Sequence, residues 1–225
     1  MAVSMWDEND RLIDAGAQQT WQVQEDQEVE LSARAEDSID DLSGLSYEWS
    51  FGVSTDGRES RVPMVWNDEG MKTILVKAVD SEGEDSGWAE RWVDVKNLEP
   101  QIEDLPEVMA IAEGQSFTIS GMAWDTPSDM DSLIVCWDVD PGADTDGIGS
   151  ADDDCDVEGE NLTWSWQNSG IYNVVFHATD NNGARNSSSA SVTVLTLPPI
   201  VMVNTPTKVV AGETVILDAS KTMDS

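Results

Sequence analysis

The sequence predicts an all-β protein made of tandem β-sandwich domains, and three observations carry that prediction. Residues 45–52 alternate apolar and polar side chains, which is typical of a half-buried strand with Tyr47, Trp49 and Phe51 on one face. The same pattern recurs 88 positions later (137 minus 49) around Trp137. Ten Trp, 16 Gly and 8 Pro supply apolar anchors and frequent turns, and no long helical period competes with them. Trp49 and Trp137 are therefore expected to anchor two separate cores.

An opening strand pattern occurs three times. Residues 26–31 (Asp-Gln-Glu-Val-Glu-Leu) match residues 114–119 at an offset of 88 (114 minus 26). Residues 212–217 match again, 98 positions further on (212 minus 114). Repetition at such a period indicates an array of similar domains.

A later pattern locates an insertion in the second copy. Residues 70–83 match residues 170–183 at an offset of 100 (170 minus 70), which exceeds the earlier offset of 88. The difference indicates 12 extra residues between the Trp137 strand and Gly170.

The closing strands give the domain boundaries. Residues 89–95 and 190–195 alternate as strands and are followed by Pro100 and by Pro198-Pro199, and proline interrupts sheet pairing. The expected parts are a tail of a preceding repeat or linker (1–13), a first sandwich (14–97), a second sandwich with an acidic insertion at about 140–160 (98–197), and the start of a truncated third repeat (198–225).

The charge is strongly acidic. The chain has 45 acidic against 11 basic residues and a formal net charge of −34, which argues against nucleic acid and anionic membrane surfaces as partners. No apolar run is long enough for direct membrane insertion. An acidic surface that favours solubility and bound Ca²⁺ are compatible explanations. The N-terminal residues carry no signal-peptide pattern, so we expect an internal piece of a longer protein.

The order of the motifs resembles a known family. A Gly-x-x-Val-x-Leu strand, a Tyr-x-Trp-x-Phe-Gly strand, a Gly-x-Tyr-x-Val strand and a Val-x-Asp-x-x-Gly hairpin follow one another as in the PKD domain. The resemblance implies tandem immunoglobulin-like Greek-key β-sandwiches in a secreted or cell-surface protein. The copies depart from the pattern at Lys72 and at Val139-Asp140, and a generic immunoglobulin-like or cadherin-like sandwich is the alternative.

No residue pattern supports catalysis. The only histidine, His177, falls at an outward strand position and is expected to be solvated. One histidine cannot form an ordinary zinc cluster, and no Ser or Cys nucleophile lies beside a base. Acidic pairs are frequent in so acidic a chain, so they do not indicate a glycosidase. We expect a protein that is not an enzyme.

Aspartates that repeat between the copies are the first candidate Ca²⁺ ligands. In a Greek-key sandwich the B–C and F–G loops lie at the same end, where carboxylates could supply the oxygens that Ca²⁺ prefers. The alternative for each is a turn cap that accepts nearby backbone N–H groups. These candidates are Asp37 and Asp41, which match Asp125 and Asp129, and Asp80, which matches Asp180.

The insertion holds the second set of candidates. The stretch around Asp144-Thr145-Asp146-Gly147 is similar to calcium-binding loops of thrombospondin type 3 repeats, but it does not fit an EF-hand. So many carboxylates repel one another unless they are solvated or neutralised by a cation. The set comprises Asp138, Asp140, Asp144, Asp146, Asp152, Asp153, Asp154 and Asp156.

The two cysteines, Cys136 and Cys155, are 19 positions apart. A disulfide is favoured, because it would tie the insertion to its own sheet and stabilise the fold by about 3 kcal/mol in the chain-entropy model. Two free thiols are the alternative in a cytosolic protein.

Function is expected to be that of a spacer. The sequence favours an extracellular or cell-surface repeat module that binds a cell-surface protein or glycan and contacts neighbouring repeats of the same chain, with Ca²⁺ stiffening its loops. Alternatives are accessory modules of a secreted hydrolase and direct carbohydrate binding. Sugar binding would use exposed members of the set Trp66, Trp88, Trp92, Trp164 and Trp166.

Overall fold

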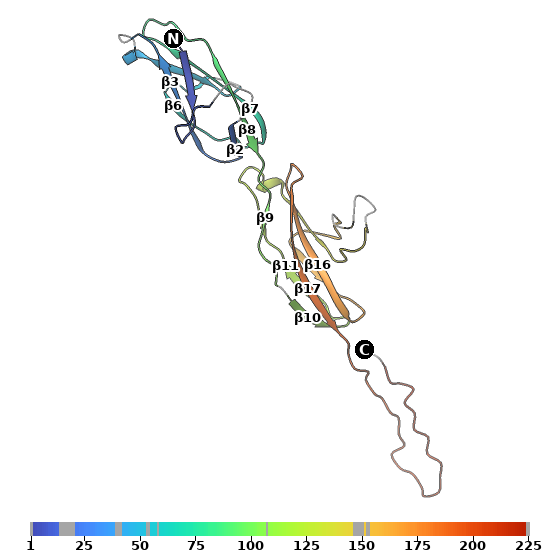
Figure 1. Ribbon diagram of the computed structural model, residues 1–225. Coiled ribbons are helices and arrows are strands. Elements are labelled where there is room, and N and C mark those ends of the chain that lie inside the picture. The colour runs from blue at the N-terminus through green and yellow to red at the C-terminus, as the bar shows by residue number, and fades with distance from the viewer. Residues whose placement is uncertain are drawn as a thin grey trace. The chain divides into compact units, whose positions relative to one another are not determined.

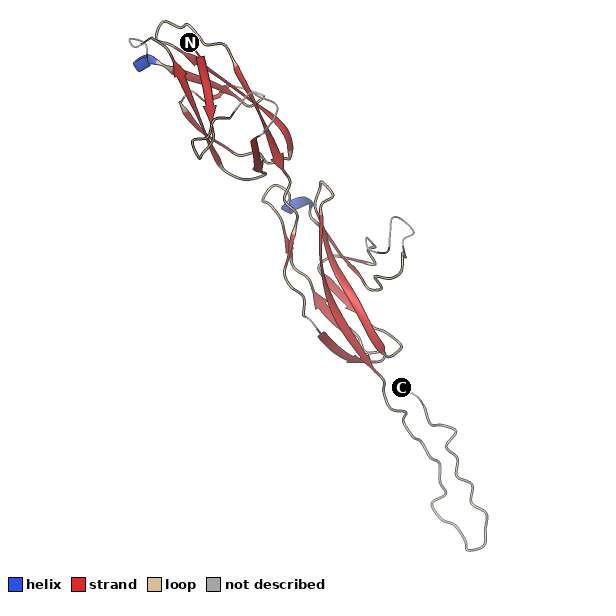
Figure 2. Cartoon of the chain, in the orientation of Figure 1, coloured by secondary structure: helices blue, strands red, loops and turns tan. Residues whose placement is uncertain are grey.

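Nearly all regular structure is β, as Figure 2 shows. The computed structural model describes residues 2–13, 21–38, 42–52, 55–57, 59–106, 108–145, 151 and 154–223. Within these ranges the helical structure consists of two single 3₁₀ turns, η1 (Leu42–Gly44) and η2 (Met130–Ser132), and no described helix is long and apolar enough to cross a membrane. The predicted all-β class is confirmed.

The chain divides into two compact units, and two loops from its second half belong to the first of them. Unit 1 comprises Met1–Pro100, Asp125–Leu133 and Asp180–Ala184, and unit 2 comprises Gln101–Trp124, Ile134–Thr179 and Arg185–Ser225.

Unit 1 contains two sheets (Figure 1). In the larger sheet β2 pairs parallel to β8, whereas β8 with β7, β7 with β4 and β4 with β5 pair antiparallel. Its order is β2 (Trp21–Gln24), β8 (Ala89–Lys96), β7 (Gly70–Val79), β4 (Ser46–Ser50) and β5 (Thr55–Gly57). The smaller sheet has the order β1 (Ala2–Trp6), β3 (Val29–Glu36) and β6 (Arg61–Met64).

Unit 2 repeats this plan, except that two two-stranded pairings stand in place of the three-stranded sheet. Its five-stranded sheet has the order β10 (Val108–Ala112), β17 (Arg185–Leu195), β16 (Gly170–Thr179), β13 (Ile134–Asp138) and β14 (Val157–Glu158), with β10 parallel to β17. The opposite side is formed by β11 (Phe117–Ser120) with β15 (Asn161–Trp164), and by β9 (Gln101–Ile102) with β12 (Ala123–Trp124).

The connections are those of a Greek key. In unit 1, β3 pairs with β6 in one sheet while β4 pairs with β7 in the other, so the chain crosses from one sheet to the other after β3, after β5 and after β6. This is the immunoglobulin-like sandwich that the alternation and the turn spacing predict.

Each core is built on its tryptophan. Trp49 and Trp137 are both fully buried, and both indoles satisfy their single donor within their own unit. Trp49 Nε1 donates to the Glu59 carbonyl at 2.9 Å, and Trp137 Nε1 donates to the Glu160 carbonyl at 3.2 Å. The two residues therefore hold equivalent places in strands β4 and β13.

Residues 1–13 were expected to be a tail of a preceding repeat, but the structure builds them into unit 1. β1 pairs antiparallel with β3 from Ala2↔Glu36 onward, and Met5 is fully buried in the core. β9 pairs with β12 in the same way through Gln101↔Trp124. β1 and β9 are thus offset by 99 positions (101 minus 2), whereas their pairing partners are offset by 88 (124 minus 36). A search with one repeat offset could therefore not show that β1 and β9 are equivalent strands.

The segment after β17 forms two isolated bridges in its described part. Ile200 pairs with Met223, and Asn204 pairs with Asp218. The described side chains from Ile200 to Met223 are exposed, and this segment is grouped with unit 2.

Candidate metal centres

Four carboxylates gather in unit 1 and are called here the loop cluster: Glu25, Asp125, Asp129 and Asp180. Glu25 directly follows β2, and its backbone N–H continues the pairing with β8 by donating to the Lys96 carbonyl at 3.0 Å. This main-chain bond fixes where the Glu25 side chain begins.

Glu25 and Asp129 are the least exposed residues of the loop cluster, and each is 2% exposed. Glu25 Oε1 accepts the Leu98 backbone N–H at 2.7 Å, whereas Oε2 has no hydrogen-bond partner. Asp129 Oδ1 accepts from the Asn181 side-chain amide at 2.9 Å, and its Oδ2 is also without a partner. Each buried carboxylate therefore keeps one oxygen unsatisfied, which is costly in a protein interior.

Asp180 both caps a turn and takes part in the loop cluster. Its Oδ1 accepts the backbone N–H groups of Asn182 at 2.9 Å and Ala184 at 2.8 Å, which is the capping role expected of an aspartate in a hairpin. Its Oδ2 accepts the Asn97 side-chain amide at 2.8 Å, and the Asn97 Oδ1 is left without a partner. Capping and ligation are thus compatible, because they use different oxygens.

Electrostatics strain the loop cluster. Burial raises the pKa of Glu25, Asp125 and Asp129, and neighbouring carboxylates of the cluster raise it further. None of the ion pairs in the described ranges involves these residues. Carboxylate oxygens are the type of ligand that Ca²⁺ prefers. Among the described residues, however, the three carboxylates whose oxygens lie within 4.8 Å of one another belong to the insertion and not to the loop cluster.

Two participants were not anticipated. Glu25 is not among the ligands that the sequence predicts, although the offset of 88 (113 minus 25) gives it an equivalent, Glu113, in the second copy. Asp26 is predicted only to open a strand. Asp26 Oδ2 accepts both the backbone N–H of Ser128 at 2.9 Å and its hydroxyl at 2.8 Å. Asp26 thereby holds the loop that carries Asp125 and Asp129.

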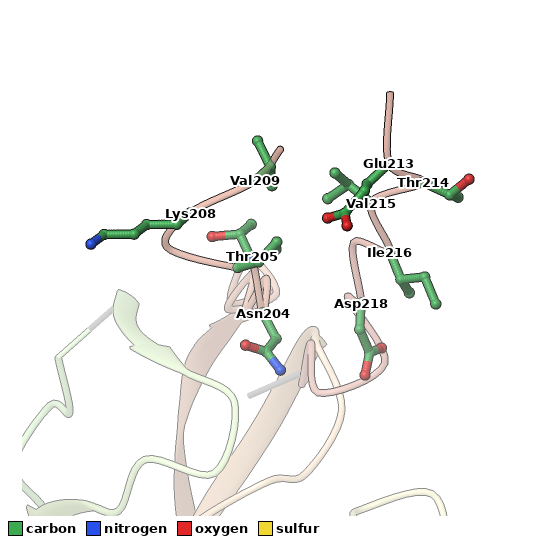
Figure 3. A pocket seen from close by; sticks show the side chains of 10 residues that line it. Asn204, Thr205, Lys208, Val209, Glu213, Thr214, Val215, Ile216 and Asp218 are labelled. Atoms are coloured by element: carbon green, nitrogen blue, oxygen red, sulfur yellow. The ribbon is translucent and has the colours of Figure 1, made fainter. Parts of the chain in front are cut away.

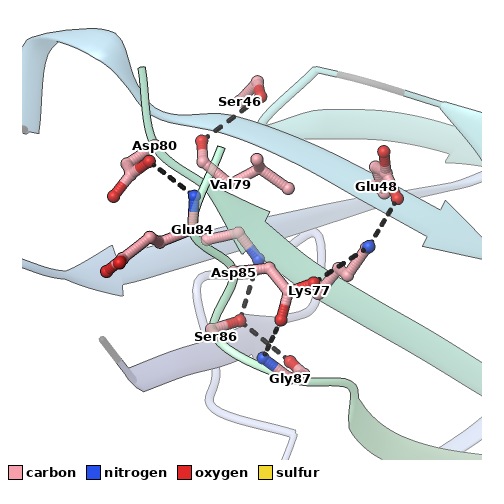
Figure 4. A network of polar contacts seen from close by, with 10 residues as sticks. Ser46, Glu48, Lys77, Val79, Asp80, Glu84, Asp85, Ser86 and Gly87 are labelled. Carbon is pink, nitrogen blue, oxygen red and sulfur yellow. Dashed lines mark hydrogen bonds and ion pairs between the residues drawn. The ribbon is translucent and has the colours of Figure 1, made fainter. Parts of the chain in front are cut away.

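The first copy's aspartates are not brought together in the same way. Asp80 Oδ1 accepts the backbone N–H of Glu82 at 2.9 Å. It also accepts the backbone N–H of Glu84 at 2.9 Å (Figure 4), so Asp80 caps its hairpin like Asp180. Asp37 Oδ1 accepts the Ser38 N–H at 2.9 Å, a bond within its own loop. Asp41 lies outside the described residues.

A second group lies in the insertion and is called here the insertion cluster: Asp138, Asp140 and Asp156. One carboxylate oxygen from each residue lies within 4.8 Å of the other two. Asp138 is fully buried at the end of β13, its Oδ1 accepts the Asp140 N–H at 2.9 Å, and its Oδ2 has no hydrogen-bond partner.

Backbone bonds hold the insertion cluster together. Asp156 Oδ2 accepts the Val139 N–H at 2.8 Å, and the Asp156 N–H donates to the Trp137 carbonyl at 2.9 Å. Burial raises the pKa of Asp138 to about 6, with smaller contributions from the nearby carboxylates of Asp156 and Asp140.

Other predicted residues of the insertion have varied positions. Asp154 is 1% exposed, and its Oδ2 accepts the N–H of Thr145 at 2.7 Å as well as the hydroxyl of that residue. Asp144 is exposed. Asp146, Asp152 and Asp153 lie outside the described residues.

Cys136 and Cys155 form a disulfide, with Cα atoms 5.7 Å apart. Cys136 opposes His177 in the register between β13 and β16, so both side chains share a sheet face. His177 was expected to be solvated, but it is only 5% exposed. The expectation was wrong because the disulfide holds the insertion against that face.

The tryptophans separate into packed and exposed members. Trp66 is buried and meets Trp21 edge to face at 5.9 Å, while Trp166 stacks on Tyr172 at 4.7 Å. Trp88 and Trp92 are 47% and 54% exposed.

One open hollow lies in the segment after β17 and is lined by residues between Asn204 and Asp218 (Figure 3). All of its lining side chains are exposed, and they include no nucleophile beside a base.

Comparison with known proteins gives distant similarities only. No protein-family model and no curated protein sequence matches the chain. Fibronectin(III)-like modules of Clostridium thermocellum CbhA are 16% identical with a TM-score of 0.33, covering 86% of this chain and 94% of that one. Drosophila N-cadherin EC1-3 is also 16% identical with a TM-score of 0.33, and the match covers 85% of this chain and 67% of that one. Extracellular domains 3–5 of Drosophila OTK are 10% identical with a TM-score of 0.37, and the match covers 78% of this chain and 58% of that one. Likeness at this level says nothing about activity or partners.

Proposed function

We propose that this chain is a non-catalytic repeat module of an extracellular or cell-surface protein, serving as a spacer and as an interaction surface for a protein or glycan, with Ca²⁺ bound at the loop cluster. The observation that carries the proposal is the pair of buried carboxylates, Glu25 and Asp129, whose second oxygens lack any partner. A divalent cation supplies the missing charge and the missing contacts at once.

Two features support a spacer outside the cytosol. The Cys136–Cys155 disulfide is typical of oxidising compartments, and each sandwich has an apolar core built around its own tryptophan, Trp49 or Trp137. Ca²⁺ would fix the loops Asp125–Leu133 and Asp180–Ala184 against Glu25 and Asn97, so that these loops keep a defined conformation.

Thermal unfolding of the whole chain tests the metal. Millimolar Ca²⁺ is expected to raise the Tm above its value in chelator, because a ligand that binds only the folded form stabilises it, by about 2.7 kcal/mol at a concentration 100 times the Kd. Glu25→Gln and Asp129→Asn should each remove the greater part of that increase. Asp131→Asn is the matched control, since Asp131 lies in the same 3₁₀ turn and is exposed. Equal Tm values in chelator and in Ca²⁺ would exclude the proposal.

Direct sugar binding is a second candidate, favoured by the exposure of Trp88 and Trp92. The Lys77 ammonium lies 5.2 Å from the Trp88 ring centroid, so Trp92 is the freer ring for stacking on a sugar. Pull-down on insoluble glycans, compared between the wild-type chain and Trp92→Ala, tests this function. An accessory role beside a secreted hydrolase would be recognised from a catalytic domain in the flanking sequence.

A further inference from the structure

We propose that the insertion cluster binds a second divalent cation, independent of the loop cluster, through one carboxylate oxygen each from Asp138, Asp140 and Asp156, and that the Cys136–Cys155 disulfide preorganises this site. This inference goes beyond the proposed function, because it concerns other residues in another unit.

The first step is geometric. Three carboxylate oxygens within 4.8 Å of one another can share one cation at the 2.3–2.6 Å that Ca²⁺ requires, since two oxygens on opposite sides of such an ion lie about 4.6–5.2 Å apart. Three carboxylates also exceed the charge of one divalent ion, which favours tight binding over a purely solvated arrangement.

The second step is the state of Asp138. An acidic cluster on a surface needs no ion, but the Asp138 side chain is fully inaccessible, and its Oδ2 has no protein partner. An ionised carboxylate in that position is unfavourable without a counter-charge. The backbone N–H of Asp140 satisfies only Oδ1, so Oδ2 remains available to a cation.

The third step concerns preorganisation. Asp138 lies two residues after Cys136, and Asp156 directly follows Cys155. The disulfide therefore joins the two chain segments that supply the ligands, and the Val139 N–H bond to Asp156 Oδ2 fixes the rotamer of the third carboxylate. Supports of this kind around metal ligands are worth roughly 10–100-fold in affinity.

The test measures cation stoichiometry on the full chain, with Ca²⁺ by calorimetry and with Tb³⁺ by tryptophan-sensitised luminescence. A Glu25→Gln/Asp129→Asn background removes the loop cluster, and one equivalent is expected to remain. Adding Asp140→Asn should weaken that remaining site at least about tenfold. Glu158→Gln is the control, because Glu158 is an exposed carboxylate on the neighbouring strand β14.

Asp140 is changed instead of Asp138 because Asp138 is buried and its substitution could impair folding, whereas Asp140 is exposed.

The outcomes decide the proposal as follows. A Cys136→Ala/Cys155→Ala chain that remains folded should bind at least about tenfold more weakly, and unchanged affinity would remove the disulfide from the site. No bound cation in the Glu25→Gln/Asp129→Asn background, or equal affinity after Asp140→Asn, overturns the insertion site and leaves the proposed function standing. A single bound equivalent that Glu25→Gln/Asp129→Asn leaves unchanged and Asp140→Asn weakens would support the insertion site and overturn Ca²⁺ binding at the loop cluster.

Discussion

At the residue scale, one close contact in unit 2 depends on a missing side chain. Gly121 is buried, and a Cβ at that position would lie 2.5 Å from Cδ1 of Phe176. Phe176 is itself fully buried and packs on Trp137 with ring centroids 4.9 Å apart. The ring therefore has no free space into which it can move.

Gly121→Ala is expected to destabilise unit 2 by about 1–3 kcal/mol, the usual cost of overpacking a close-packed core. Gly142→Ala is the matched control, because a Cβ there meets nothing within 4 Å. Urea denaturation followed by tryptophan fluorescence checks the difference. Equal midpoints for the two variants would contradict the packing described for Phe176.

Asp138 is expected to make the stability of the fold depend on pH. Its pKa is raised from 3.8 to about 6 by burial, and the carboxylates of Asp156, Asp140 and Asp154 contribute in the same direction. The folded chain therefore holds this proton up to a higher pH than the unfolded chain does. In metal-free solution the contribution of Asp138 to stability should decline as the pH rises from about 4 to about 6.

The Tm in chelator, measured across that window for the wild-type chain and for Asp138→Asn, checks this sign. The wild type should lose more stability between pH 4 and pH 6 than the variant, because only the wild type releases the proton. Parallel curves for the two proteins would show that Asp138 titrates normally.

At the element scale, β7 and β16 occupy equivalent positions in the two units but have different surroundings. Lys77 and His177 are equivalent at an offset of 100 (177 minus 77). Lys77 Nζ pairs with Glu48 at 3.0 Å and with Asp85 at 3.3 Å (Figure 4). His177 instead opposes Cys136, beneath the insertion. His177 is buried at this position, whereas Lys77 is half-buried, and the disulfide that ties the insertion to this face is the difference between the two copies here.

Removing the disulfide should destabilise unit 2 and make the insertion more accessible to protease. Cys136→Ala/Cys155→Ala is expected to lower the stability of unit 2 by about 3 kcal/mol in the chain-entropy model and to expose the insertion to protease. Alanine avoids placing a hydroxyl at Cys136, which is 5% exposed. Limited proteolysis with mass spectrometry locates the cleavage, and protection equal to the wild type would show that the backbone bonds to Asp156 suffice.

At the scale of the whole molecule, charge dominates. A net charge of −34 produces self-repulsion that opposes folding and that salt screens. Only five ion pairs offset it among the residues that the structure describes.

The Tm in chelator is therefore expected to rise with NaCl between low and molar concentrations. A screening gain of about 1 kcal/mol would raise the Tm by roughly 4–8 °C for a domain of this size. Scanning calorimetry at constant pH measures the trend. Tetramethylammonium chloride should act similarly, since the effect is screening. A Tm that is constant or falls with salt would contradict it.

The sequence by itself determined the sandwiches. Period-two alternation and the tryptophan repeat are local patterns, and burying one face of each strand leaves few ways to pair them. The same local patterns could not assign Ala2–Trp6, because the loop after that strand differs in length between the copies and hides the match.

Only the tertiary structure decided which aspartates meet. The repeat predicts Asp125, Asp129 and Asp180, but it does not predict that Glu25, 100 residues before Asp125 (125 minus 25), lies near Asp125 and Asp129. Glu25 is positioned there because it directly follows β2, which pairs beside β8. The composition of the insertion likewise could not show that Asp138, Asp140 and Asp156 come together among the aspartates that the structure describes there. Burial and a missing hydrogen-bond partner distinguish a ligand from a solvated carboxylate, and both depend on the packing of segments that are distant in sequence.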